Sequence, residues 1–561
     1  MNINQERAIN LSAAVIMMLL LVGTMVYAQP ASTVTRNPNA KLLRRIWTMT
    51  GKQRDENAGY GIGSLGDIFG TGYSAWAAYG GISGQWRVFK GDSGTLSTTP
   101  VWVFDSSSGM TRHPLVGDFW GTGHKAVGFS KYTIDTLRGS TNFPYVLYLF
   151  RSEYNRLDTI PSLILDPRKM PAHAFVGISD AQAVDLDGDG ADELILYNIG
   201  VIRNGSVDRH PEIWIYRGGP HFQVDTPTVI LHDGDINGGS DYDHMFIGNW
   251  DGDGRPDIAV VDDYNDGKNP AIKFWFSKDG SPWSWNYPDR VVPQRRTTAL
   301  FAKALDCDGD GILDLALPAP GQRIVLYRSS AGKDYHTRIL DTNDADGVYQ
   351  FSSLSDLEQL GFINDKGRRY GMLGAYVPSP GGSAMLLGFG GGANGPDAQY
   401  DCYYAAEFDP VGGIGGYYVL GMAQSAGDVN GDGWDDVLEG SFQYNNYAGI
   451  AIILAGGPEI PRDASAGVEI IAGEGHFSAI SVWPLPARDE VHIAWRGDLR
   501  RMPERFEVHD ISGRSVARGV VESWRGEALW ECGNLAAGAY ILSMYDSDGV
   551  LIATKEVLKS Q

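Results

Sequence analysis

The chain contains a nine-residue acidic stretch, Asp185-Leu-Asp187-Gly-Asp189-Gly190-Ala-Asp-Glu193. Three further stretches repeat its pattern of oxygen-bearing side chains at positions 1, 3, 5 and 9 with glycine at position 6: Asn249-Trp-Asp251-Gly-Asp253-Gly254-Arg-Pro-Asp257, Asp306-Cys-Asp308-Gly-Asp310-Gly311-Ile-Leu-Asp314 and Asp428-Val-Asn430-Gly-Asp432-Gly433-Trp-Asp-Asp436. Carboxylate and amide oxygens at this spacing suit a hard cation with many ligands, and the glycine permits the positive φ of a tight turn. The four loops therefore predict about four bound Ca²⁺ ions.

The last ligand distinguishes these loops from an EF-hand, which places it at position 12 before a helix. Here it stands at position 9, and short aliphatic runs such as 194–196 and 258–261 follow, which is typical of strands. Each loop is thus expected to be a metal-filled turn between two strands. The alternative is that Asp-Gly turns simply make good hairpins without metal. If calcium is bound, we expect its role to be structural, because the crowded carboxylates repel one another without it.

Weaker copies of the loop appear when glycine 6 sets the register. Stretches beginning at Asp67 and Asp118 keep both glycines but place Phe69 or Trp120 at position 3, and a third begins at Phe362. The seven copies start roughly 50 to 70 residues apart, and a second strand-like stretch lies in every interval. Units of this size cannot bury both faces alone, so the sequence predicts an all-β fold with a seven-bladed β-propeller. A parallel β-helix is the alternative, although its rungs are usually shorter.

The loops and the strands that follow resemble FG-GAP (VCBS-type) repeats, as in the head of integrin α-subunits, over roughly residues 45 to 460. This resemblance implies calcium in the inter-strand loops of some blades. It also implies a further ligand, the backbone carbonyl at position 7, which is supplied by Ala191, Arg255, Ile312 and Trp434. The first, second and sixth copies depart from the pattern, and no metal is expected there.

The C-terminal part of the chain has motifs of its own. They include Val482-Trp-Pro484-Leu-Pro486, Asp510-Ile-Ser-Gly513 and Leu535-Ala-Ala-Gly538, set among alternating apolar positions that predict a small Ig-like β-sandwich. This region resembles the type A C-terminal sorting domain of the type IX secretion system, with Leu485 where Asn is usual. The resemblance implies an export address read by the type IX machinery. An ordinary accessory β-domain is the alternative.

The first residues are typical of a secretory signal. Arg7 precedes an apolar stretch from about Ala8 to Val26, and Val26-Tyr27-Ala28 offers a cleavage site. An uncleaved membrane anchor is the alternative. The expected domains are a signal peptide at 1–28, the propeller at 29–470 and the sorting domain at 471–561, which together predict a secreted protein or one on the outer cell surface.

Charge and cysteine content narrow the function classes. A net charge of −22 argues against nucleic acid as a partner. With three cysteines the chain can form at most one internal disulfide, so disulfides cannot be its main source of stability. Their odd number leaves at least one thiol unpaired within the chain.

We find no catalytic motif in the sequence, so we expect a binding or adhesion module for an extracellular glycan or protein ligand. The alternative is a carbohydrate-active enzyme, a lyase or hydrolase, on a propeller scaffold. A cluster of His, Tyr, Arg or carboxylate side chains on a face away from the metal loops would favour the enzyme.

Overall fold

The fold was analysed in a computed structural model of the whole chain. It describes residues between 32 and 559, apart from 106–112, 133–144, 167–173, 233–243, 262–270, 278–285, 294–301, 329–346, 406–421, 462–478 and shorter gaps. The predicted signal sequence at 1–28 lies outside the described residues. The described residues divide into two compact units between Pro461 and Arg462, with the short stretch 392–394 grouped with the second unit.

The first unit is built almost wholly of antiparallel ladders, mostly of four strands, and each ladder contains one copy of the acidic loop or of its weaker form. The last two ladders are joined into one nine-stranded sheet by a parallel pairing of Gln359 with Gln424. We number the ladders, and their loops, in chain order. Sheet 1 is β4 (Ile62–Gly66), β5 (Ala75–Gly80), β6 (Gln85–Phe89) and β7 (Trp102–Asp105). Sheet 2 is β8 (Leu115–Gly117), β9 (Ala126–Tyr132) and β10 (Tyr145–Glu153), with β12 (Leu163–Leu165) and β11 (Arg156–Leu157) on its outer edge. Sheet 3 is β14 (Ile178–Val184), β15 (Glu193–Asn198), β18 (Glu212–Tyr216) and β19 (Val229–His232).

The same order of strands continues through the rest of the unit. Sheet 4 is β20 (His244–Gly248), β21 (Asp257–Val261), β22 (Ala271–Trp275) and β23 (Arg290–Pro293). Sheet 5 is β24 (Lys303–Leu305), β25 (Asp314–Ala319), β26 (Arg323–Tyr327) and β27 (Gly347–Gln350). Sheet 6 is β28 (Asp356–Gly361), β29 (Met372–Pro378), β30 (Ala384–Phe389) and β31 (Gln399–Tyr404). Sheet 7 is β32 (Met422–Gly427), β33 (Asp436–Ser441) and β34 (Ile450–Ala455), completed from the N-terminus by β3 (Arg44–Thr50).

The N-terminal segment pairs with three consecutive sheets. β1 (Ser32–Thr33) adds in parallel to β27, β2 (Thr35–Leu42) adds in parallel to β31, and β3 closes sheet 7 by antiparallel pairing with β34. We call residues 32–50 the strap. Because the N-terminal strand β3 completes the last sheet, the succession of sheets is closed by a pairing between the two ends of the unit.

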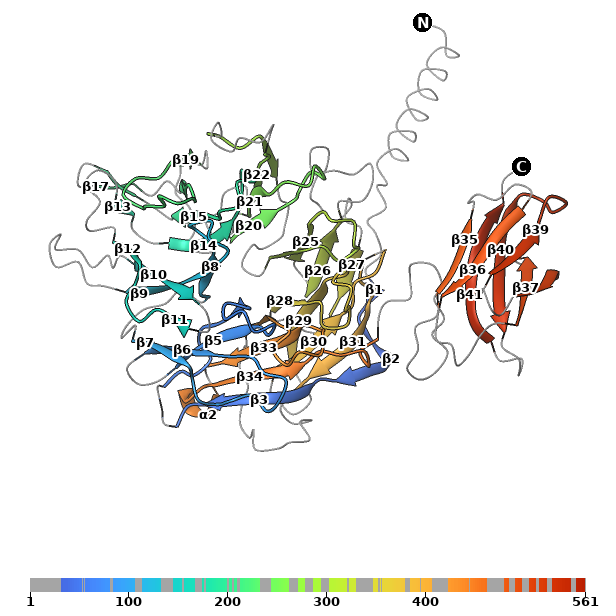
Figure 1. Ribbon diagram of the computed structural model, residues 1–561, viewed down its shortest axis with the longest axis horizontal. Helices are drawn as coiled ribbons and strands as arrows, with labels where there is room; N and C mark the ends of the chain where they lie inside the picture. The colour runs from blue at the N-terminus through green and yellow to red at the C-terminus, as the bar shows by residue number, and fades with distance from the viewer. Residues whose placement is uncertain are drawn as a thin grey trace, which may run out of the picture. The chain divides into compact units, whose positions relative to one another are not determined.

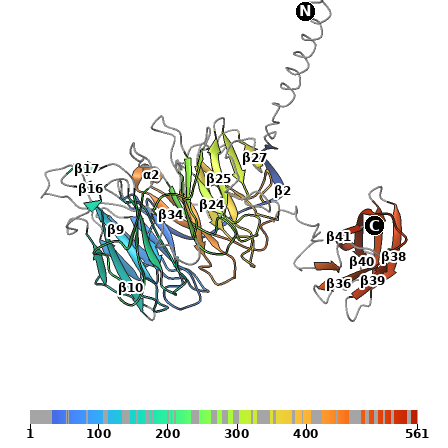
Figure 2. The same ribbon diagram turned by 90° about the horizontal axis from the view of Figure 1, so that it is seen from above.

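Hydrogen bonds between the first strands of sheets 1 and 7 also join the two ends of this succession of sheets. The Ser64 hydroxyl of sheet 1 donates to the carbonyl of Ala426 in sheet 7 at 2.7 Å, and the Gln424 side chain donates to the carbonyl of Ile62 at 2.7 Å. Sheets 2 and 5 lie on opposite sides of the unit when it is viewed from two directions (Figure 1, Figure 2). These are the features of a β-propeller arrangement.

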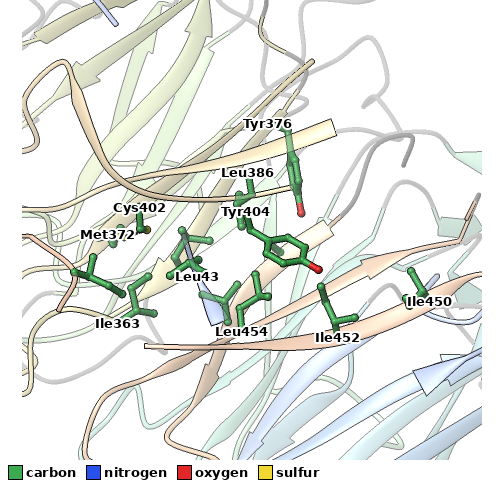
Figure 3. Close-up of a cluster of buried hydrophobic side chains, with 14 of the residues drawn as sticks. Leu43, Ile363, Met372, Tyr376, Leu386, Cys402, Tyr404, Ile450, Ile452 and Leu454 are labelled. Carbon is green, nitrogen blue, oxygen red and sulfur yellow. Dashed lines mark hydrogen bonds between the residues drawn. The ribbon is translucent and has the colours of Figure 1, made fainter. Parts of the chain in front are cut away.

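The core lies between neighbouring sheets. In Figure 3, Tyr376 and Leu386 of sheet 6 face Ile452 and Leu454 of sheet 7, and all four side chains are at most 1% exposed. Second and third strands such as Glu193–Asn198 and Glu212–Tyr216 are buried at every position, because both faces of each sheet are covered. The wholly apolar runs in the sequence have this physical cause.

Two small additions interrupt the pattern. β13 (Ala174–Phe175), β16 (Val201–Arg203) and β17 (Ser206–Asp208) form a separate three-stranded sheet. A single turn of helix, α2 (Tyr444–Tyr447), joins β33 to β34. Within the described part of the chain, no helix has the length and apolarity needed to span a bilayer.

The second unit is a β-sandwich. One sheet consists of β35 (Ala479–Trp483), β36 (Glu490–Arg496) and β39 (Glu527–Glu531). The other consists of β38 (Ser515–Val520), β37 (Arg505–Asp510), β40 (Gly538–Tyr545) and β41 (Leu551–Lys559). Val491 and Trp530 of the first sheet share one buried cluster with Val508 and Leu542 of the second. The predicted all-β fold class is confirmed, while the number of blades stays a prediction.

Candidate metal centre

Every acidic loop connects the first strand of its sheet to the second. Position 9 is the first residue of the second strand in all four intact loops, so Glu193, Asp257, Asp314 and Asp436 begin β15, β21, β25 and β33. Because the seven sheets share one strand order, the loops lie at the same end of their sheets. We call this the loop end.

The residue at position 1 folds each loop by accepting backbone N–H groups. In loop 3, Asp185 Oδ1 accepts from Gly188 at 2.7 Å and Oδ2 accepts from Gly190 at 2.9 Å. Gly190 has φ of 89°, which disfavours any residue with a Cβ. Asp306 and Asp428 accept the corresponding N–H groups in loops 5 and 7. The sequence pattern therefore fixes the turn as well as the oxygen positions.

Loop 4 differs because position 1 is an amide. Asn249 Oδ1 accepts from Gly252 at 2.8 Å, and its Nδ2 donates to the carbonyl of Gly311 in loop 5 at 2.9 Å. A backbone bond from Leu313 to the Asn249 carbonyl also joins the two loops, at 2.9 Å. Neighbouring loops thus support one another at this end of the propeller.

The position-9 carboxylate is buried beneath each loop. Glu193 accepts from the backbone N–H of Leu186 at 2.7 Å and of Gly218 at 3.1 Å. Asp257 and Asp436 each accept two backbone N–H groups in the same way. Burial nevertheless raises the pKa of Glu193 to about 7, of Asp257 to about 7 and of Asp436 to about 8. Carboxylates that are costly to ionise in isolation are well suited to a bound cation.

Loops 3 and 5 bring three carboxylates together. Oxygen atoms of Asp185, Asp187 and Glu193 lie within 4.8 Å of one another, and so do those of Asp306, Asp308 and Asp314. Asp308 is 6% exposed, and its Oδ1 atom is buried without a hydrogen-bond partner. Burial also raises the pKa of Asp308 to about 6. An unsatisfied buried carboxylate oxygen beside two others is the arrangement that a divalent cation would complete.

The remaining predicted ligands lie at the rims of their loops. Asp189, Asp253, Asp310 and Asp432 at position 5 each accept the backbone N–H of position 7, which belongs to Ala191, Arg255, Ile312 and Trp434 respectively. At position 3, Asp251 and Asn430 accept the N–H of position 5. These bonds hold the rim oxygens close to the loop backbone in all four loops.

The weak copies keep the turn without the acidic ligands. Asp67 accepts from Thr71 at 2.8 Å and from Gly72 at 2.7 Å, as position 1 does elsewhere. Loop 6 differs from the sequence alignment that places its position 1 at Phe362. Its backbone N–H groups at Arg369 and Tyr370 are capped by Asp365, at 2.8 and 2.9 Å. The loop between β28 and β29 is longer than its counterparts, so its glycine does not occupy position 6 and the predicted register of this loop is wrong.

Sequence reasoning missed a charged group that is buried midway along the strands of sheets 5, 6 and 7. Glu439 of β33 and Glu358 of β28 are 2% and 4% exposed. Lys303 of β24 contacts Glu358, with 3.3 Å between Nζ and Oε2. Burial, with the charge of Glu358 adding to it, raises the pKa of Glu439 to about 8. No motif marks these residues, because they come from three different sheets.

A second polar group lies in sheet 3, at the end opposite the loop end. Glu212 accepts from Trp214 Nε1 at 2.8 Å and lies 3.5 Å from His232 Nδ1. The His232 ring is 5.9 Å from that of Tyr287, which is 62% exposed. Tyr287 belongs to an aromatic stretch whose Trp283 and Trp285 lie outside the described residues.

The cysteines form no disulfide. Cys307, Cys402 and Cys532 are all buried, and Cys307 lies within loop 5. Burial raises the pKa of the Cys307 thiol well above its usual value, and Cys307 Sγ lies 2.7 Å from Asp314 Oδ2. A buried neutral thiol of this kind is a packing residue.

Comparison with known proteins identifies the C-terminal unit. Residues 481–559 match the family described as secretion system C-terminal sorting domain. No curated protein matches the chain. Among solved structures, the chain is similar to one described as "Structure of Dos1 propeller", with a TM-score of 0.36 and 7% sequence identity, over 68% of this chain and 75% of that chain. The propeller arrangement therefore rests on the sheets themselves.

The sorting-domain prediction is confirmed by this match, and with it the predicted localisation. Such domains mark proteins that the type IX system exports to the cell surface or beyond it. Residues 481–559 are thus a secretion system C-terminal sorting domain, and the chain is a type IX export cargo of the cell surface or extracellular space.

Proposed function

We propose that the exported chain is a calcium-stabilised binding module whose first unit is a seven-bladed propeller of FG-GAP type. The signal peptide at 1–28, the propeller at 29–470 and the sorting domain at 471–561 are its proposed parts. Seven ladders with one strand order, closed by the strap, support the blade number. The type IX machinery would recognise the sorting domain, and the propeller would be the cargo.

The observation that carries the calcium proposal is the orphaned Asp308 Oδ1 within the carboxylate group of loop 5. A bound Ca²⁺ would satisfy that atom and neutralise charges that the loop holds together at a cost. Side chains at positions 1, 3, 5 and 9 would hold the ion in each intact loop, with the position-7 carbonyl. The ion would crosslink the first and second strands of its sheet.

Calcium removal tests this proposal. We expect the mature chain to contain about four Ca²⁺ ions and EGTA to lower its Tm by about 10 °C or more, since ligand binding to the folded state alone stabilises it. Calcium content by elemental analysis and Tm by calorimetry give the answer. A calcium-free chain whose Tm is unmoved by EGTA would refute structural calcium.

The ligand of the module is proposed to be an extracellular glycan. Exposed Tyr287 beside His232 offers an aromatic face with a polar neighbour, which is a common way to stack and orient a sugar. Screening the mature chain on glycan arrays, followed by Tyr287→Ala on any hit, tests this. Loss of binding in the variant supports the site, and unchanged binding places the ligand elsewhere.

A carbohydrate-active enzyme is the second candidate. Glu212 with His232 is a group of the expected type at the end of sheet 3 away from the metal loops. Glu439 with Glu358 and Lys303 is a second group, buried midway along its strands. Turnover of any array-positive glycan that Glu212→Gln abolishes would favour the enzyme over the binding module.

A further inference from the structure

One position of the third strand faces the first residue of the second strand in every sheet, which is position 9 of every loop except loop 6. In sheet 2 the pair is Ala126 with Arg151, and extending the same register by one residue places Arg217 opposite Glu193 in sheet 3. Across the seven sheets this position is occupied, in chain order, by Lys90, Arg151, Arg217, Phe276, Arg328, Gly390 and Ala455. We call it the cross-strand position. It is cationic in four sheets and uncharged in three.

The cation at this position always reaches loop position 3. In the loops without acidic ligands it lies over an aromatic ring, with Arg151 Cζ 3.8 Å from the centre of Trp120 and Lys90 Nζ 5.8 Å from that of Phe69. In loops 3 and 5 the residue at position 3 is an aspartate instead. The geometry is shared, so a side-chain cation directed at position 3 is a property of the cross-strand position.

In loop 3 this cation uses the oxygens that calcium would need. Arg217 Nη2 lies 2.7 Å from Asp187 Oδ2 and 3.3 Å from Asp189 Oδ2. The other oxygens of these two carboxylates accept backbone N–H groups of the loop. In loop 5, Arg328 Nη1 lies 3.6 Å from Asp308 Oδ2. The side chains of Asp187 and Asp308 are only 5% and 4% exposed. The Arg328 side chain is 18% exposed, so solvent screens the pair in loop 5 weakly, whereas the Arg217 side chain is 50% exposed and its pairs are screened more.

Among the four intact loops, a cross-strand arginine occurs only where the loop carries a carboxylate at all four ligand positions. Loops 3 and 5 have carboxylates at positions 1, 3, 5 and 9, whereas loop 4 has Asn249 at position 1 and loop 7 has Asn430 at position 3. Phe276 and Ala455, which occupy the cross-strand position in sheets 4 and 7, carry no charge. Over positions 1, 3, 5 and 9 together with the cross-strand position, each of the four sets therefore carries a formal net charge of −3.

We propose that Arg217 and Arg328 are built-in counter-ions that let loops 3 and 5 fold without calcium and make them the last loops to bind it. This inference rests on the proposed calcium function. Loops 4 and 7 have no guanidinium at the cross-strand position. Arg255 of loop 4 reaches only the partly exposed Asp253, with 3.9 Å between Nε and Oδ2, so these two loops fill first. Sheets 4 and 7 then depend on calcium more strongly than sheets 3 and 5.

Calcium titration of the full mature chain tests the order. After stripping with EGTA, isothermal titration with CaCl₂ should show two tighter and two weaker sites. Arg217→Ala with Arg328→Ala should strengthen the weaker pair by about five- to tenfold, since one positive charge leaves each loop. The same variant should have a lower Tm in EGTA than the unmodified chain. Without calcium and without the arginine, the four carboxylates of each of these loops repel one another with no positive charge beside them.

Matched variants separate charge from packing. Arg151→Ala removes the same residue from the same position over Trp120 and should leave the calcium isotherm unchanged. The double variant Asp187→Asn with Arg217→Ala gives loop 3 the same residue types that sheet 7 has in Asn430 and Ala455. In EGTA its Tm should therefore be higher than that of Arg217→Ala alone and close to that of the unmodified chain.

Three outcomes contradict the proposal. Four equal sites in the unmodified chain, or an arginine variant with unchanged or weaker calcium binding, would overturn it while leaving calcium function intact. A chain that binds no calcium in any loop would overturn the proposed function and this inference together.

Discussion

At the scale of single residues, Glu439 shows how burial decides protonation. Its Oε2 atom is buried without a hydrogen-bond partner, and Glu358 lies in the same space between sheets 6 and 7. Burial raises its pKa from 4.5 to about 8. The folded chain therefore keeps this proton at neutral pH, while the unfolded chain has lost it.

Stability should consequently fall as pH rises from about 4.5 to about 8 through this residue. We expect Glu439→Gln, which mimics the neutral acid, to raise the free energy of unfolding by about 3 kcal/mol at pH 8 and by little at pH 5. Thermal unfolding of both proteins at the two pH values measures this. The control is Glu358→Gln, which breaks the contact with Lys303 and should destabilise. An equal effect of Glu439→Gln at both pH values would contradict the assignment.

At the scale of elements, the strap is the most consequential feature. Its first two strands add a fifth strand to sheets 5 and 6, which already have four, whereas β3 supplies the outer strand that sheet 7 lacks. Trp47 of β3 is 3% exposed and packs against Trp76 of sheet 1 with ring centres 5.2 Å apart. The strap thus joins the last sheet to the first.

We expect removal of residues 32–42 to lower Tm modestly, because it uncovers the edges of complete sheets and leaves the buried Leu43 in place. Removal of residues 32–50 should instead prevent cooperative folding, since it opens sheet 7 and deletes Trp47 from the core. Trp47→Ala, which keeps the strand but empties its site, should lie between them, at a cost of about 3 to 5 kcal/mol. Calorimetry of the three variants gives the ranking, and equal Tm values for the two truncations would contradict the closing role of β3.

At the scale of the whole molecule, the two units have separate cores. The cluster of the sandwich contains residues between Val491 and Val557 alone, and those of the propeller end at Ile460. The described residues of the first unit end at Pro461 and those of the second, apart from 392–394, begin at Ala479, so the boundary expected at residue 470 lies outside the described residues. Two cores without shared residues should fold independently.

We therefore expect a chain ending at Pro461 to keep its Tm and its calcium content but to be retained inside the producing cell. The full chain is the control, and surface exposure is measured by protease accessibility on intact cells. Failure of the shortened chain to fold would show that the propeller depends on the second unit. Its normal export would show that residues 481–559 are dispensable as an address.

Much of this architecture could be predicted from the sequence because it is encoded locally. The turns of the acidic loops are indicated by glycines, which adopt positive φ, and by capping residues at position 1 such as Asp185. The strand after each loop is indicated by a continuous apolar run. The sorting domain was recognisable for the same reason, since its motifs are short and in order. Loop 6 shows the limit of local reasoning, because its extra length moved the capping role to Asp365.

The sequence by itself thus determined the strand-and-loop repeat, the all-β class, the acidic side chains of the loops and the export address. Only the tertiary structure decided which chain ends meet, since β3 and β34 are hundreds of residues apart and many strands could have closed sheet 7. It also decided where Arg217 and Arg328 point, and that Glu439 is buried beside Glu358. Those relationships depend on the register between strands and on the packing of neighbouring sheets, and no spacing along the chain encodes either.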